Sequence, residues 1–240
     1  MSMFCYQCEQ TAKSEACTMH GVCGKDPEVA ALQDLLVHAV KSISAYAHRA
    51  RQFDAIDQEV DAFVPFAVFT TLTNTNFDPE DFQGFLEKAA DLRDRVRELY
   101  LQAASDAGET PETLAWADEW QPADDLNVLI RQGKQVGIEP RLEKYGKDVG
   151  GLQETIVYGL KGAGAYTHHA KVLGLEDEDL YGFFHELLDF VASEPTDVDE
   201  LFANALRAGE LNLQAMQLLD AAFSRAHRPP RPTPVRVTPV

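Results

Sequence analysis

The sequence predicts an all-α fold in which an N-terminal cysteine-rich loop precedes two related antiparallel three-helix-type bundles. Three observations support this prediction. After Gly24, apolar residues recur every three or four positions, segments that alternate like β-strands are nearly absent, and one helical segment occurs twice. This spacing places apolar side chains on one face of each helix, so that the helices pack through these faces.

The first two predicted helices have clear sequence signals. Asp26-Pro27-Glu28 is typical of a helix start, with an N-cap, a proline at the first helical position and an acid in the first turn. The apolar stripe from Leu32 onward extends this helix to about Gln52. A second stripe covers residues 60–72, and Pro65 within it predicts a kink or a break.

Further helices are predicted along the rest of the chain. Asp78-Pro79-Glu80 begins one that extends to about Leu99, and Thr110-Pro111-Glu112 begins a short one. Between residues 121 and 146, Gly133, Gly137, Pro140 and Gly146 interrupt the helical pattern, so we expect the two bundles to divide there. In the second bundle we expect His185 to be a surface or boundary residue.

The chain contains an internal repeat. Residues 32–51 and 152–171 have eight identical positions out of twenty at an offset of 120. Residues 80–85 resemble residues 178–183 in the same way, at an offset of 98. Duplication explains both matches. We therefore expect the following organisation: a loop in residues 1–26, one helical bundle in 27–120, a second in 147–227, and a proline-rich linker or the start of another domain in 228–240.

All four cysteines of the chain lie within its first 23 residues. They are Cys5, Cys8, Cys17 and Cys23, with the spacing C-x2-C-x8-C-x5-C. Disulfides suit small secreted domains, but no charged-then-apolar leader precedes Cys5 and a chain of 240 residues can bury a core without them. We therefore expect the four thiols to hold one inorganic centre.

The spacing alone leaves two metals open. Structural zinc usually takes two short-spaced cysteine pairs, and only Cys5 and Cys8 form such a pair here. An iron-sulfur cluster takes four thiolates from a flexible loop rich in backbone amides, which this segment provides. The predicted helix start after Cys23 would add the positive end of a helix dipole, and Lys25 a cation, unless Lys25 is simply solvated.

These residues carry a resemblance to a known family. The N-terminal segment is similar to that of the hybrid cluster proteins, also called prismane proteins or hydroxylamine reductases. The similarity rests on two runs and the cysteine between them: Met3-Phe4-Cys5-Tyr6-Gln7-Cys8-Glu9-Gln10-Thr11, Cys17, and Gly21-Val22-Cys23-Gly24-Lys25-Asp26-Pro27-Glu28-Val29-Ala30.

The resemblance implies a cofactor and a limit on activity. It implies that Cys5, Cys8, Cys17 and Cys23 bind a cubane 4Fe-4S cluster, at the end of an all-helical domain. Longer family members hold a second, mixed iron-sulfur-oxygen cluster in later domains, whose ligands are absent from this sequence. We therefore expect an electron-transfer module without hydroxylamine or nitric oxide reduction of its own, either an excised domain or a natural short protein.

The charge composition restricts the kinds of molecule that we expect the protein to bind. The chain has 21 Lys and Arg against 39 Asp and Glu, a net charge of -18 that repels nucleic acid and anionic lipid. We expect a cytoplasmic protein whose partner is a redox protein that donates or accepts electrons. The sequence contains no HExxH, Glu-x-x-His, Walker lysine loop or G-x-G-x-x-G motif, so we predict no catalytic residue. The alternative is a non-redox helical interaction domain with structural zinc at the four cysteines.

Overall fold

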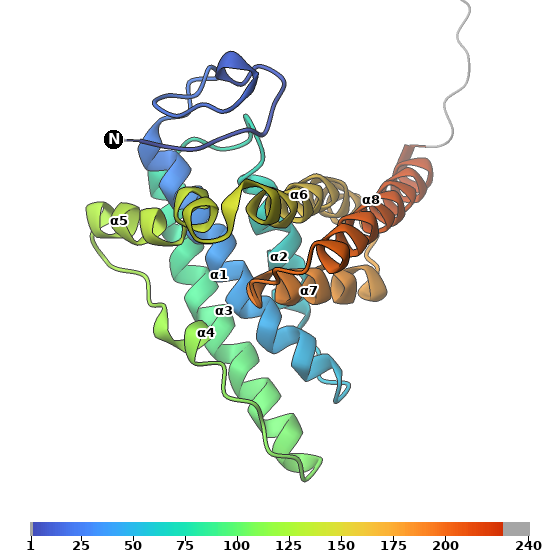
Figure 1. Ribbon diagram of the computed structural model, residues 1–240. Coiled ribbons are helices and arrows are strands. Elements are labelled where there is room, and N and C mark those ends of the chain that lie inside the picture. Colours follow the sequence, from blue (N-terminus) through green and yellow to red (C-terminus); the bar gives the residue numbers. More distant parts are fainter. Residues whose placement is uncertain (1, 228–240) are drawn as a thin grey trace, which may run out of the picture.

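The computed structural model describes residues 2–227, which are mainly helical (Figure 1). The all-α prediction is confirmed, and within these residues the extended pairing is limited to one bridge between Cys5 and Cys17. The elements are η1 (Ala12–Ser14), α1 (Pro27–Arg51), α2 (Gln58–Thr70), α3 (Pro79–Asp106), α4 (Ala115–Glu119), α5 (Leu126–Val136), α6 (Ile138–Val172), α7 (Glu178–Ala192) and α8 (Val198–His227). The predicted linker, 228–240, lies outside the described residues.

Aspartate side chains begin most of the helices. Helices α1, α2, α3, α5 and α7 each start with an aspartate whose carboxylate accepts hydrogen bonds from backbone amides of the first turn. At α1, Asp26 accepts from the amides of Glu28 and Val29 at 3.0 and 2.8 Å, and Pro27 is the first helical residue, as predicted. Such a cap stabilises a helix by about 1 kcal/mol.

Helix α2 continues through Pro65 without a break, so the predicted break is wrong. A proline removes one hydrogen bond from a helix, but its fixed φ angle is itself helical. The neighbouring Phe63, Val64 and Val68 are buried, and the packing of these apolar side chains outweighs the lost bond. Gly164 of α6 lies directly against the carbonyl of Pro65, where an added Cβ would approach the oxygen to 2.6 Å.

The segment 121–146 contains more helix than its glycines suggest. Helix α5 occupies much of it, and α6 begins immediately afterwards at Ile138. Gly137 separates the two helices, and Gly146 interrupts α6 with a φ of +79°, a conformation that glycine adopts without strain. Gly133 lets α5 lie against the backbone of α1, because a Cβ there would overlap the carbonyl of Ala31.

The two helices that carry the sequence repeat, α1 and α6, occupy the centre of the fold. Helix α1 packs along α3, α5 and α7, whereas α6 packs along α8 and α2 (Figure 1). Helix α2 therefore lies mainly on α6, and α7 mainly on α1, so the helices of the two sequence halves interleave around one apolar core. The division of the chain into two bundles stays a prediction. Within residues 2–227, no helix combines the length and the apolarity needed to cross a membrane.

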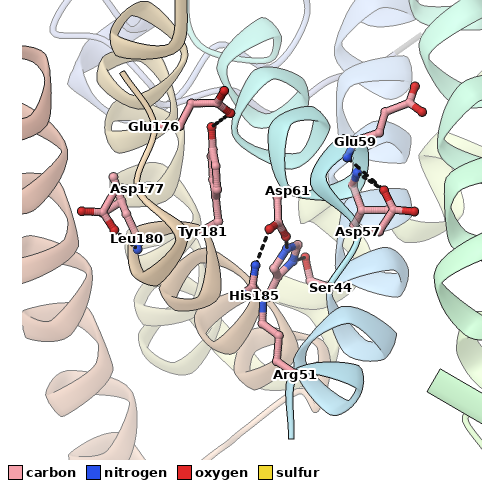
Figure 2. A network of polar contacts seen from close by, with 11 residues as sticks. Ser44, Arg51, Asp57, Glu59, Asp61, Glu176, Asp177, Leu180, Tyr181 and His185 are labelled. Carbon is pink, nitrogen blue, oxygen red and sulfur yellow. Dashed lines mark hydrogen bonds and ion pairs between the residues drawn. The ribbon is translucent and has the colours of Figure 1, made fainter. Parts of the chain in front are cut away.

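A buried polar network joins α1, α2 and α7. Figure 2 shows the ring of His185 between two polar partners, with Nε2 2.9 Å from Asp61 Oδ1 and Nδ1 3.1 Å from Ser44 Oγ. Arg51 forms an ion pair with the other oxygen of Asp61. His185 is fully buried, so its predicted place at the surface or boundary is wrong. Its apolar neighbours in sequence gave no sign of the acid that α2 supplies.

Candidate functional site

The cysteine-rich segment forms a loop over the N-terminal end of α1 (Figure 1). Cys5 and Cys17 face each other across the backbone bridge, with two N–H···O bonds of 3.1 and 2.8 Å. The amide of Met3 donates to the carbonyl of Thr18 at 3.0 Å and extends this pairing by one rung. The side chains of Met3 and Cys17 then pack against Ala30 in the first turn of α1, which fixes the loop to the helix.

The four cysteines are free thiols with different exposures. Cys17 is buried, and Cys5, Cys8 and Cys23 are partly exposed. In the described residues no group of three or more Cys, His, Asp or Glu side chains has an arrangement that could hold a metal ion. The loop thus brings the backbones of Cys5 and Cys17 together and does not gather all four sulfurs. The assignment of the four as metal ligands stays a prediction.

Lys25 supplies a buried positive charge beside this loop. Its side chain is only 2% exposed, so the solvated alternative is wrong. The ammonium Nζ lies 3.9 Å from Cys5 Sγ and donates to Gln33 Oε1 at 2.5 Å. Gln33 in turn donates to the carbonyl of Asn76 at 3.1 Å, so the loop between α2 and α3 also supports the lysine. This contact places a buried positive charge beside the sulfur of Cys5.

The backbone after Cys23 directs the helix dipole of α1 towards the same region. Gly24 has a φ of +95°, a left-handed conformation that a side chain would strain. This turn places Lys25 and the N-cap Asp26 immediately after Cys23. The donor set therefore fits an anionic thiolate-bound cluster in its chemistry: four free sulfurs, a buried ammonium and the positive end of a helix.

A second set of contacts ties the loop to α6. Tyr158 donates to the carbonyl of Gln7 at 2.9 Å, and the Tyr6 hydroxyl lies 3.4 Å from Glu154 Oε2. Glu154 also forms an ion pair with Arg141. Burial, together with the carboxylate of Glu154, raises the pKa of Tyr6 well above its ordinary value, so the tyrosine stays a hydrogen-bond donor.

Four charged side chains from the two copies of the repeat lie below the loop, and all but the half-buried Asp34 are buried. Asp34 and Lys41 of α1 correspond to Glu154 and Lys161 of α6 at the offset of 120. Burial raises the pKa of Asp34 to about 6, and it lowers the pKa of Lys41 to about 7 and that of Lys161 to about 8. This layer was not predicted from the sequence. The available signal was an acid and a lysine seven residues apart at matched positions in both copies.

The arrangement of Ser44, His185 and Asp61 resembles a hydrolase triad, but it does not form an active site. A nucleophilic serine has to reach a substrate carbonyl. Ser44 and His185 are fully buried, and Asp61 is also held by Arg51. This network joins three helices and has a structural role.

Comparisons with known proteins agree with the N-terminal motif. Three relatives, each named hydroxylamine reductase, show the range of similarity. The proteins from Burkholderia ambifaria, Acidithiobacillus ferrooxidans and Halothermothrix orenii are 48%, 44% and 39% identical to this chain. Each alignment covers 99% of this chain and 42–44% of the relative, so the chain spans less than half the length of these proteins.

The family assignment extends over almost the entire sequence. Residues 3–240 match the Prismane/CO dehydrogenase family, and this range includes the cysteine loop and the helices that support it. The resemblance found from the cysteine spacing and its flanking residues is therefore confirmed. The chain belongs to the Prismane/CO dehydrogenase family.

Proposed function

We propose that Cys5, Cys8, Cys17 and Cys23 bind one 4Fe-4S cluster and that the chain is an electron-transfer module of the hydroxylamine reductase type. The observation that carries this proposal is the buried ammonium of Lys25, 3.9 Å from Cys5 Sγ at the edge of a loop with four free thiols. When bound, such a cluster would accept and release single electrons.

The surroundings of the loop favour an anionic cluster. Four thiolates bring more negative charge than the metal core balances, so nearby positive charge stabilises the site. Lys25 and the N-terminus of α1 lie on the side of the loop that faces the protein. Their charge would also raise the reduction potential, because reduction adds one more negative charge beside them.

The partial exposure of three cysteines supports electron exchange with another protein. Cys5, Cys8 and Cys23 are partly open to solvent, so a bound cluster would lie near the surface. A redox protein could approach it there. The net charge of -18 favours a partner with a basic docking surface. We propose the cytoplasm as the location, since a reducing compartment keeps the four thiols free.

Binding would require the cysteine side chains to converge. The bridge between Cys5 and Cys17 and the contact of Cys17 with Ala30 already fix one side of the loop. Cys8 and Cys23 do not take part in this backbone pairing. We therefore propose that metal binding orders the rest of the loop, as occurs when a metal site and its local fold form together.

Anaerobic reconstitution distinguishes this function from a structural zinc site. The protein is incubated with iron and sulfide in one sample and with zinc in another, and metals are counted after desalting. The proposal predicts a brown protein whose broad visible absorption is bleached by dithionite. A colourless protein that retains zinc and rejects iron and sulfide would favour the helical interaction domain.

The electron-transfer role also predicts what the isolated chain does not do. The reconstituted protein should accept electrons from a reduced dye and pass them to an oxidised electron carrier. With hydroxylamine as the acceptor it should show no sustained turnover. A robust hydroxylamine reductase rate from pure protein would contradict the assignment of the chain as a transfer module alone.

A further inference from the structure

A separate cavity is lined by two members of the charged layer below the cysteine loop, Asp34 and Lys41. It has a volume of about 530 Å³ and lies between α1, α4, the end of α5, the start of α6 and the C-terminal end of α7. This is within the size range of small-molecule sites, roughly 300 to 1,000 Å³. Its lining includes no cysteine, so its ligand is independent of the metal proposal.

Two cationic groups in this lining have unused hydrogen-bonding capacity. Lys41 is 7% exposed and, among the described residues, its ammonium makes no hydrogen bond or ion pair. Arg141 uses one end of its guanidinium for Glu154, while its Nη1 is buried without a partner. Nη1 of Arg141 is a buried donor without a partner, which is costly. An anionic acceptor in the cavity would satisfy it and would also pair with the ammonium of Lys41.

The other charged groups of the lining leave this capacity available. Glu194 is already paired with Lys144 and accepts from Tyr145. Asp34 also lines the cavity, beside Gly137, and among the described residues it forms no hydrogen bond or ion pair with Lys41 or Arg141; burial raises its pKa to about 6. His38 stands between Asp34 and Lys41 on α1, and burial lowers its pKa to about 4, so its ring is neutral near pH 7.

The remaining wall is largely apolar. Side chains from all the surrounding helices contribute to it: Val37, Trp116, Val136, Pro140 and Val191. A purely inorganic anion would leave this surface in contact with water. A small organic acid would use both parts of the cavity, with a charged head and an apolar body.

We propose that this cavity binds a small organic anion, with its carboxylate held by Lys41 and Arg141 Nη1 and its apolar body against the valines of the lining. Burial and the adjacent charge of Arg141 lower the pKa of Lys41 to about 7 in the free protein. A bound carboxylate would reverse part of this shift, because it favours the charged lysine.

The proposal is tested by ¹⁹F NMR of 4-fluorobenzoate with the full chain. Its neutral analogue 4-fluorobenzamide has the same shape without the charge. We expect saturable binding of the benzoate and at least roughly tenfold weaker binding of the amide, since one charge-assisted contact corresponds to a factor of this size. Absence of saturation by the benzoate up to about 10 mM, or equal binding of the amide, would overturn the proposal.

Variants locate the binding in the cavity. Lys41→Met should weaken benzoate binding at least roughly tenfold, and Lys41→Arg should largely preserve it. Lys88→Met is the matched control, because Lys88 is an exposed lysine paired with Glu59 on another part of the surface. If Lys41→Met does not fold, Ala192→Phe tests the same site by filling the cavity without a change in charge. Unchanged affinity in the folded Lys41→Met protein, or in Ala192→Phe, would overturn the site.

Discussion

The ammonium of Lys25 lies 3.9 Å from the sulfur of Cys5, on a side chain that is almost completely buried. No other lysine of the cysteine loop has this position, since Lys13 is exposed. The contact connects the residue just before the N-cap of α1 to one of the four predicted cluster ligands. A substitution of Lys25 therefore tests whether its charge acts on the proposed cluster.

Replacing Lys25 should change the redox behaviour of the bound cluster. The positive charge of Lys25 beside Cys5 stabilises the reduced, more negative state of the cluster. Lys25→Met removes this charge. We expect the reduction potential to fall by on the order of 50 mV, measured by dye-mediated titration. Lys13→Met makes the same change in charge at an exposed position and should leave the potential nearly unaltered. Equal potentials for Lys25→Met and the unmodified protein would contradict this role.

Loss of one proposed ligand should affect the loop and spare the helices. Cys17 packs with Met3 and Ala30 in a small cluster separate from the main apolar core. Cys17→Ser should abolish cluster incorporation while circular dichroism retains nearly all the helical signal, because burial rather than metal stabilises the helices. Thr18→Ser, a neighbouring change without loss of a thiol, should bind the cluster normally. Wholesale loss of helix in Cys17→Ser would show that the centre is a folding nucleus.

The contact between α6 and α2 depends on a glycine. At Gly164 an added Cβ would lie 2.6 Å from the Pro65 carbonyl oxygen and 2.8 Å from a methyl of Val68. Gly164→Ala should therefore lower the free energy of unfolding by about 1–3 kcal/mol. Gly162→Ala is the matched control in the same helix, where the nearest atom is 3.9 Å away, and it should be neutral or slightly stabilising. Chemical denaturation measures both, and equal effects would contradict the close approach.

Stability should decline in mild acid through His38. Burial, with the charges of Lys41 and Arg141, lowers the pKa of His38 from 6.5 to about 4, while Glu194 opposes this shift. Between these pH values the unfolded chain binds a proton that the folded chain does not, so the free energy of unfolding falls as pH decreases. The full effect is about 3 kcal/mol. His38→Gln should flatten the stability profile between pH 6.5 and 4, relative to the unmodified protein. An unchanged slope would contradict the buried neutral histidine.

Much of the fold could be predicted from local sequence signals. Asp26 and Pro27 identify the start of α1 because capping depends on only a few consecutive residues. The repeat identifies α1 and α6, whose stripes became the centre of the core. Pro65 was misleading because the burial of Phe63, Val64 and Val68 around it depends on the tertiary fold and not on the local sequence. His185 misled because its partner Asp61 lies on a different helix.

The candidate site, too, could be predicted only where its signal lies in a short stretch of sequence. The cysteine spacing and flanking residues were sufficient to identify the family, which the relatives confirm. The contact of Lys25 with Cys5 could be suggested from their proximity in sequence. The cavity beside Lys41 could not be predicted, because its walls come from five helices. The unpartnered Nη1 of Arg141 is likewise a tertiary feature, since another nitrogen of the same guanidinium pairs with Glu154.

The most direct test of the account is low-temperature EPR and Mössbauer spectroscopy of anaerobically reconstituted protein before and after reduction with dithionite. The account predicts the spectra of one cubane cluster per chain, which gains one electron on reduction and disappears in Cys17→Ser. Fully reconstituted, oxygen-free protein without a cubane spectrum would contradict the assignment of the four cysteines as cluster ligands.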